Sequence, residues 1–102
     1  MKLMIVDDEE LTRKGVIASI DWNKLGISQV LEAEDGLQGL QKARMFKPDI
    51  ILSDVRMPRM DGISMAAELE KELPDTSVIF MSGYSDKEYL MAAIRLQAVH
   101  YV

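Results

Sequence analysis

The sequence predicts an α/β fold built on a doubly wound parallel sheet of five strands. Two observations point to this class. Short apolar runs rich in β-branched residues recur along the chain without polar alternation, as strands do when helices cover both faces of a parallel sheet. Stretches with helical periodicity separate these runs, and the resulting βαβαβαβα order is typical of sheets with right-handed crossovers.

Five segments are predicted to be strands. Three purely apolar runs should be central strands, namely Leu3–Val6, Ile50–Leu52 and Val78–Met81. The run Gln29–Ala33 carries two polar residues and fits a more exposed strand at the edge of the sheet. The last short apolar piece, Val99–Val102, is predicted to be the fifth strand.

Four helices are expected between the strands, each with one buried apolar stripe. The stripes, in chain order, are Leu11, Gly15 and Ala18 with Val16 and Ile17 beside them; Leu37, Leu40, Ala43 and Phe46; Ile63, Ala66, Leu69 and Leu73; and Leu90, Ala93, Ile94 and Gln97. The boundaries agree with these assignments. Pro48 and Pro74 end helices before strands, Gly36 and Gly62 stand at helix starts, and Asp86 is a suitable N-cap for the fourth helix.

Length and charge limit what this chain can be. Its 102 residues suit one domain, spanning residues 1–102, and 48% hydrophobic residues are enough for a core. A net charge of −5 argues against direct contact with nucleic acid or an anionic membrane, because phosphate binding depends on cationic side chains. The absence of cysteine excludes disulfides and thiolate sites and is compatible with a cytoplasmic protein. The N-terminal segment is predicted to be neither a signal peptide nor a membrane span.

Acidic residues follow two of the predicted central strands. Asp7 and Asp8 come directly after the first strand, Asp54 follows the third, and Ser82 follows the fourth. Each of these alone is explained by a helix cap or a turn. In a doubly wound sheet, however, the carboxyl ends of the strands meet at one edge, where ligands bind. Three carboxylates about 4 to 6 Å apart repel one another by a few kcal/mol per pair, so the site needs a compensating cation.

A hard divalent cation suits such a pocket, because Mg²⁺ prefers carboxylate, water and phosphate oxygens. A metal beside a carboxylate indicates phosphoryl chemistry, in which an aspartate can act as the nucleophile and become an aspartyl phosphate. Asp54 is best placed for this role, with Asp7 and Asp8 as metal ligands. The loop after Asp54 offers a backbone carbonyl to the metal, and the Ser82 hydroxyl can donate a hydrogen bond to a phosphoryl oxygen.

These residues together resemble the receiver (response-regulator) domain of bacterial two-component systems. The resemblance covers almost the whole chain and includes Val-Asp-Asp-Glu at 6–9, Asp54 with Met57-Pro58, Met60-Asp61-Gly62 and Ser82-Gly83. It implies a flavodoxin-like sheet with the strand order 2-1-3-4-5. The segments 21–26 and 82–86 look like those of receivers that precede AraC-type DNA-binding domains.

The resemblance assigns roles to individual residues. Asp54 would accept a phosphoryl group from a sensor histidine kinase, and Asp7, Asp8, Asp54 and the backbone carbonyl of Arg56 would bind Mg²⁺. Ser82 and Tyr101 would be the coupled pair that reorients on phosphorylation. The domain would then be a signalling switch and not a stand-alone enzyme. It would control an output, expected to be transcription, elsewhere in the parent protein, and a homodimer is one assembly it could form.

The sequence departs from the receiver pattern at its C-terminal end. Receivers carry a Lys-Pro pair after the fifth strand and then a fifth helix, and this chain ends at Val102, before both. We therefore expect a C-terminally incomplete domain, and a pseudo-receiver that acts only as a protein-interaction module is the alternative. An Mg²⁺-dependent phosphohydrolase or a Toprim-like nuclease is disfavoured, because Asp7 and Asp8 are adjacent and not spaced as Asp-x-Asp.

Overall fold

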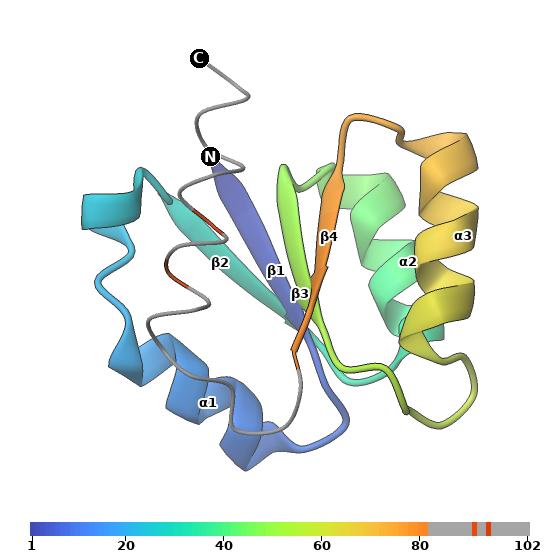
Figure 1. Cartoon of the computed structure of the whole chain (residues 1–102), viewed down its shortest axis with the longest axis horizontal. Coiled ribbons are helices and arrows are strands. Elements are labelled where there is room, and N and C mark those ends of the chain that lie inside the picture. The colour runs from blue at the N-terminus through green and yellow to red at the C-terminus, as the bar shows by residue number, and fades with distance from the viewer. Residues whose placement is uncertain (82–90, 92–93, 95–102) are drawn as a thin grey trace.

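The computed structural model describes residues 1–81 together with Met91 and Ile94. Its strands form one parallel sheet in the order β2-β1-β3-β4 (Figure 1). They are β1 (Lys2–Val6), β2 (Gln29–Ala33), β3 (Ile50–Ser53) and β4 (Ser77–Phe80). The doubly wound α/β fold is thereby confirmed. The predicted fifth strand at 99–102 lies outside the described residues, as does most of the predicted fourth helix.

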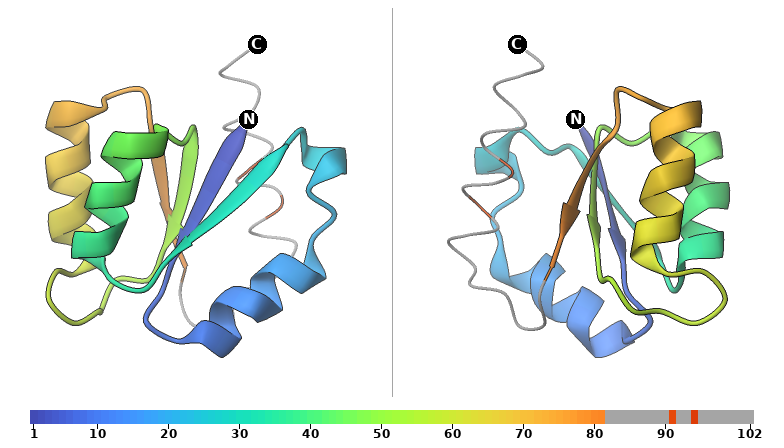
Figure 2. Two further views of the ribbon diagram at one scale, coloured as in Figure 1. Left: turned by 180° about the vertical axis from the view of Figure 1, so that it is seen from behind. Right: turned by 45° about the vertical axis from the view of Figure 1, so that its right-hand side comes forward.

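Helices cover both faces of the sheet. They are α1 (Glu10–Ser19), α2 (Gly36–Phe46) and α3 (Gly62–Glu72), with a short 3-10 helix, η1 (Asn23–Leu25), between α1 and β2. Figures 1 and 2 show α1 on one face of the sheet and α2 with α3 on the other. This arrangement makes three layers, with the sheet in the middle.

The two central strands β1 and β3 are buried on both faces of the sheet. Residues 3–6 of β1 and 50–53 of β3 are buried throughout, whereas most of β2 is only partly buried, so the predictions for these three strands are confirmed. The central position predicted for Val78–Met81 is not tested, because the predicted fifth strand lies outside the described residues. Successive side chains point to opposite faces, which divides the core into two clusters. The cluster on the α1 face includes Leu3, Ile5, Ile20, Leu52 and Ile79. The cluster on the α2 and α3 face includes Met4, Val6, Leu40, Ile51 and Met65.

The apolar stripe predicted for α1 is wrong at Leu11, Gly15 and Ala18, whereas Val16 and Ile17, which were predicted to lie beside it, do pack against the core. Leu11 is 84% exposed, and Gly15 and Ala18 are exposed as well. The inward face instead consists of Arg13, Val16 and Ile17, with the buried Ile20 just after the helix. The inward stripe begins with a charged residue, Arg13, so the apolar pattern found Val16 and Ile17 but assigned the first turn to Leu11.

The stripes predicted for α2 and α3 are correct only in part. Leu40 and Ala43 of α2 are buried, and so is Leu69 of α3. Ile63, in contrast, was predicted to be buried and is 54% exposed. Met65 was not part of the predicted stripe and is fully buried. Both helices begin at the predicted glycine. At each start an aspartate caps the helix, because Asp35 accepts a hydrogen bond from the Gln38 amide and Asp61 accepts one from the Ser64 amide.

Candidate functional site

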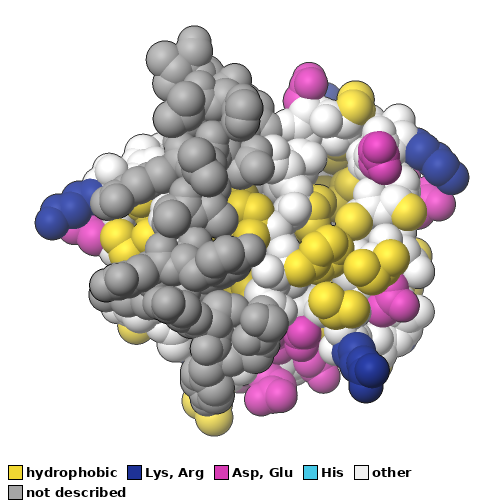
Figure 3. Space-filling view, viewed as in Figure 1, with side chains coloured by type: hydrophobic (Ala, Val, Ile, Leu, Met, Phe, Trp, Pro, Cys, Tyr) yellow, Lys and Arg dark blue, Asp and Glu magenta, His cyan; other side chains and the backbone are white. Residues whose placement is uncertain are grey.

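Strand register brings the acidic residues together. Val6 of β1 pairs with Ser53 of β3, so the residues that follow them leave the sheet side by side. The ladder continues for one step, since the Asp54 amide donates to the Val6 carbonyl at 2.9 Å. Asp7, Asp8 and Asp54 each offer a carboxylate oxygen, and these oxygens lie within 4.8 Å of one another. Figure 3 shows acidic side chains at this lower edge of the molecule.

The three carboxylates differ in their surroundings. Asp7 is only 5% exposed, and its Oδ1 accepts a hydrogen bond of 2.8 Å from the Glu9 amide. Asp8 is exposed. Asp54 is half-buried, and its Oδ1 accepts a hydrogen bond of 2.7 Å from the Val55 amide. The site therefore has one buried carboxylate at its base and two that solvent can reach.

Burial raises the pKa of the Asp7 carboxyl above its ordinary value of 3.8. The hydrogen bond from the Glu9 amide lowers this pKa, but the negative charges of Asp54, Asp8 and Glu9 raise it further. The folded protein thus holds a proton on Asp7 at a pH where the unfolded chain has lost it. Charge repulsion of this kind is what a bound cation would relieve.

Close backbone packing positions Asp54 from the other side. The Gly62 amide, at the start of α3, donates to the Val55 carbonyl at 2.8 Å, and this bond closes the loop after Asp54 at its base. A Cβ atom added at Gly62 would collide with the backbone carbonyl oxygen of Asp54. The Ser53 hydroxyl donates to that same oxygen at 2.8 Å. A glycine is therefore required where α3 begins.

The geometry agrees with a comparison of the sequence with protein families. Residues 3–102 match the model of the response regulator receiver domain. The chain belongs to this family. The match covers almost the whole chain, and so the resemblance inferred from the motifs is confirmed.

Similar proteins include two transcriptional regulators and the REC domain of a response regulator. The transcriptional regulatory protein HptR of Staphylococcus aureus (strain N315) is 32% identical over 101 residues, which cover 99% of this chain and 39% of HptR. A solved structure of a two component transcriptional regulator AraC from Clostridium phytofermentans ISDg is 41% identical with a TM-score of 0.90, over 97% of this chain and 92% of that one. The REC domain of AraT from Geobacillus stearothermophilus is 39% identical with a TM-score of 0.76, and the match covers 93% of this chain and 74% of that one. This receiver chain spans about two fifths of the length of HptR.

The remaining predicted site residues are placed less fully. Arg56 lies exposed in the loop between β3 and α3, two residues after Asp54. Ser82 and Tyr101 lie outside the described residues. Receiver domains typically bind Mg²⁺ at an acidic pocket, and the donor set of Asp7, Asp8 and Asp54 fits this ion, because all three offer hard oxygen ligands close together.

Arg13 is a site residue that the sequence reasoning missed. Its guanidinium donates to the backbone carbonyl of Asp7 at 2.6 Å and to Glu32 Oε1 at 3.0 Å. Lys14 also contacts Glu32, and the hydrogen bonds from Lys14 and Arg13 lower the pKa of Glu32. Arg13 thus ties α1 and β2 to the backbone of a predicted metal ligand. The signal in the sequence was its spacing, because Arg13 stands three residues before Val16 and four before Ile17 and therefore lies on the same face of the helix.

Replacing Asp7 with asparagine should stabilise the metal-free receiver at neutral pH. The pKa of Asp7 is higher in the folded protein than in the unfolded chain. The free energy of unfolding of the wild type therefore falls as the pH rises from the pKa of the unfolded chain through the pKa of the folded protein. Asparagine keeps an oxygen for the Glu9 amide and removes the charge. We expect the free energy of unfolding to increase by about 1 kcal/mol. This is a small value for charges so close together, because water reaches Asp8 and weakens the repulsion.

Urea denaturation in chelator, at several pH values between about 4 and 7, measures this difference. The variant should be more stable than the wild type at the upper end of the range, and the two should converge toward the lower end. A constant difference across the range would contradict the assigned ionisation of Asp7.

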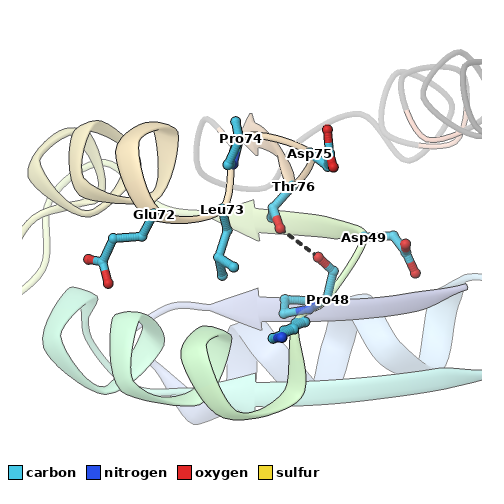
Figure 4. A pocket seen from close by; sticks show the side chains of 8 residues that line it. Pro48, Asp49, Glu72, Leu73, Pro74, Asp75 and Thr76 are labelled. Atoms are coloured by element: carbon cyan, nitrogen blue, oxygen red, sulfur yellow. Dashed lines mark hydrogen bonds between the residues drawn. The ribbon is translucent and has the colours of Figure 1, made fainter.

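A shallow hollow of about 320 Å³ lies at the opposite edge of the sheet. Figure 4 shows it between the ends of α2 and α3 and the turns that lead into β3 and β4. The Thr76 hydroxyl closes one side by donating to the Pro48 carbonyl at 2.8 Å. This hollow is therefore separate from the acidic site.

The part of the chain that the structure describes contains no helix with the length and hydropathy of a membrane span.

Proposed function

We propose that this receiver is a phosphorylation-dependent switch in which Asp54 is the phosphoacceptor. The observation that carries the proposal is the closeness of the Asp7, Asp8 and Asp54 carboxylates at the carboxyl edge of the sheet. An exposed acidic edge alone would be ordinary in a protein of net charge −5. Burying the Asp7 carboxylate beside two further carboxylates destabilises the folded protein, as its raised pKa indicates. A function that depends on a bound cation accounts for keeping these three carboxylates together.

In the proposed reaction, a carboxylate oxygen of Asp54 attacks the phosphorus of a phosphohistidine on a sensor kinase. The new O–P bond forms as the P–N bond breaks, and the leaving imidazole takes a proton from solvent. The Val55 amide holds Asp54 Oδ1, and among the described residues Oδ2 accepts no hydrogen bond, which leaves Oδ2 available for the attack. Bound Mg²⁺ would neutralise charge on the transferring phosphoryl oxygens.

The proposed metal ligands are Asp7, Asp8, Asp54 and the backbone carbonyl of Arg56. Arg13 supports the first of these by holding the Asp7 carbonyl at 2.6 Å. Ser82 is proposed to donate a hydrogen bond to the phosphoryl group, and Tyr101 to follow its movement. These two assignments are supported by family membership and by the position of Ser82 just after the fourth strand segment.

The proposed partners follow from the same family. A sensor histidine kinase would supply the phosphoryl group to this protein in the cytoplasm, and an AraC-type DNA-binding domain in the parent protein would receive the signal. A homodimer is one assembly that the protein could form. Support comes from the similar regulators of transcription and from the net charge of −5, which disfavours DNA contact by this domain itself. The domain assists its own phosphorylation and is not a stand-alone enzyme.

Intact mass after incubation with acetyl phosphate tests the proposal. We expect one added phosphoryl group in Mg²⁺, none in chelator, and peptide mapping that locates the group on Asp54. The same measurement on a chain extended by the Lys-Pro pair and fifth helix of the family shows whether that lysine is needed. If neither chain is labelled while Mg²⁺ still binds, the pseudo-receiver function replaces the proposed one.

A further inference from the structure

The loop between β3 and α3 is fastened to the start of α2. This loop, residues 54–61, contains the proposed phosphoacceptor and Arg56. The Gly36 amide donates to the Met60 carbonyl at 2.9 Å, and a Cβ atom at Gly36 would collide with that carbonyl. Figures 1 and 2 show the loop beside the turn from β2 into α2. Two segments distant in sequence are therefore in direct backbone contact.

An ion pair strengthens this contact. Asp35 is 1% exposed, and its Oδ1 is used to cap α2 through the Gln38 amide. Its Oδ2 lies 2.5 Å from an Arg59 guanidinium nitrogen, and among the described residues it accepts no hydrogen bond. The positive charge of Arg59 is thus what compensates the buried Oδ2. Glu34 Oε1 lies 3.5 Å from the same nitrogen.

The backbone of Arg59 is unusual in a way that this contact explains. Its φ is +66°, in the left-handed region that favours glycine. The left-handed backbone of Arg59 is less stable than an ordinary conformation, and the side chain in this conformation contacts Asp35. The loop is consequently held at two places, at its base by the bond from Gly62 to Val55 and at its tip by Arg59 and Met60. Arg56 lies between the two.

We propose that Arg59 and Asp35 form a positioning pair that sets the loop geometry needed for Mg²⁺ binding. The proposal rests on the proposed function, in which the Arg56 carbonyl is a metal ligand. Neither Arg59 nor Asp35 is itself a ligand. The pair acts by holding residues 56–59 against α2, so that the carbonyl is oriented before the metal arrives.

Four variants test the pair: Arg59→Gly, Arg59→Lys, Asp35→Asn and the double variant Arg59→Gly/Asp35→Asn. Arg59→Gly removes the ion pair and relieves the positive φ, so its folding is not compromised by strain. Asp35→Asn keeps an oxygen for the Gln38 amide and removes only the charge. The matched control is Arg44→Gln, which breaks the exposed ion pair of 2.7 Å between Arg44 and Glu72, away from this loop.

Mg²⁺ titration followed by amide chemical shifts gives the dissociation constant of each variant. We expect Arg59→Gly and Asp35→Asn each to weaken Mg²⁺ binding about tenfold, as loss of a supporting contact around a metal site does. The double variant should be no weaker than either single variant, because both break the same contact. Arg59→Lys should restore most of the affinity, and Arg44→Gln should leave it unchanged.

The signs of the two single effects distinguish positioning from simple electrostatics. Arg59→Gly removes a cation and Asp35→Asn removes an anion, so charge alone predicts tighter Mg²⁺ binding in the first and weaker binding in the second. Opposite signs would therefore overturn the proposal, and so would unchanged affinity in both. In metal-free protein, hydrogen exchange of the Gly36 amide should accelerate in both variants, and unchanged exchange would also overturn it.

The wild-type titration separates this inference from the proposed function. If the wild type binds Mg²⁺ and the variants behave like it, only the positioning role fails. If the wild type binds no Mg²⁺, the proposed function fails and the positioning role fails with it. Urea denaturation of every variant confirms that affinities are compared between folded proteins.

Discussion

Replacing Asp54 with asparagine should abolish the Mg²⁺-dependent phosphoryl adduct completely. The substitution keeps the shape of the side chain and leaves an oxygen to accept the 2.7 Å hydrogen bond from the Val55 amide. It removes the charged oxygen that attacks phosphorus, and an amide oxygen is a poor substitute as nucleophile. It also removes one of the three carboxylates gathered at the site, so Mg²⁺ affinity should fall at the same time.

Intact mass after acetyl phosphate treatment measures the loss, with the wild type treated in parallel. Asp21→Asn is a suitable control, because Asp21 is an exposed aspartate in the turn after α1, and asparagine keeps the oxygen that accepts a hydrogen bond of 3.4 Å from the Lys24 amide. The control should be labelled like the wild type. Equal labelling of Asp54→Asn would show that another residue accepts the phosphoryl group, and the proposed role of Asp54 would then be wrong.

The Asp54 substitution should not unfold the protein. In metal-free buffer its charge raises the pKa of Asp7, so removing it relieves repulsion at the base of the site. The variant should therefore be at least as stable as the wild type in chelator. A loss of labelling without a loss of stability assigns the effect to chemistry.

Replacing Gly62 with alanine should cost about 3 kcal/mol of folding free energy, the upper end of the usual range for overpacking. The added methyl group would collide with the Asp54 carbonyl oxygen, which is backbone and cannot rotate away. The Ser53 hydroxyl at 3.0 Å and the Phe80 ring at 3.1 Å leave no other space. For a domain of this size, such a loss lowers the melting temperature by roughly 12 to 24 °C.

Gly15→Ala is the matched control for that substitution. Gly15 lies inside α1, and apart from the helix's own backbone no atom of the described residues lies within 4 Å of the position that an alanine methyl group would take. It should raise stability by about 0.5 to 1 kcal/mol, because glycine is unfavourable in a helix interior. Thermal unfolding of both variants measures the contrast. A Gly62→Ala protein as stable as the wild type would contradict the close packing at the start of α3.

The strands and the acidic edge could be predicted because their signals are local. Leu3–Val6 and Ile50–Leu52 are apolar at every position, and only a strand covered on both faces buries such a run. Parallel strands end at the same edge, so Asp7 and Asp54 had to approach each other once both strands were assigned. Family motifs at 6–9, 54–58 and 60–62 then identified the domain.

The inward face of α1 could not be predicted in the same way. The pattern favoured Leu11, which is exposed, over Arg13, which faces inward and binds the Asp7 carbonyl. A prediction from apolar periodicity places arginine on the solvent side of a helix. A guanidinium can nevertheless face inward when it donates to a backbone carbonyl and a carboxylate at the same time. The same limit hid the pairing of Arg59 with the buried Asp35, which are 24 residues apart along the chain.

The amino-acid pattern was enough to predict the α/β class, the limits of four strands to within one residue at each end, the helix starts at Gly36 and Gly62, and the family. Three features became visible only in the folded chain: which side of α1 faces the sheet, that Asp7 is the buried carboxylate of the acidic site, and that Arg59 meets Asp35. The difference lies in the range of the interactions. Strand burial and helix starts depend on neighbouring residues, whereas desolvation and ion pairs depend on what distant segments bring into contact.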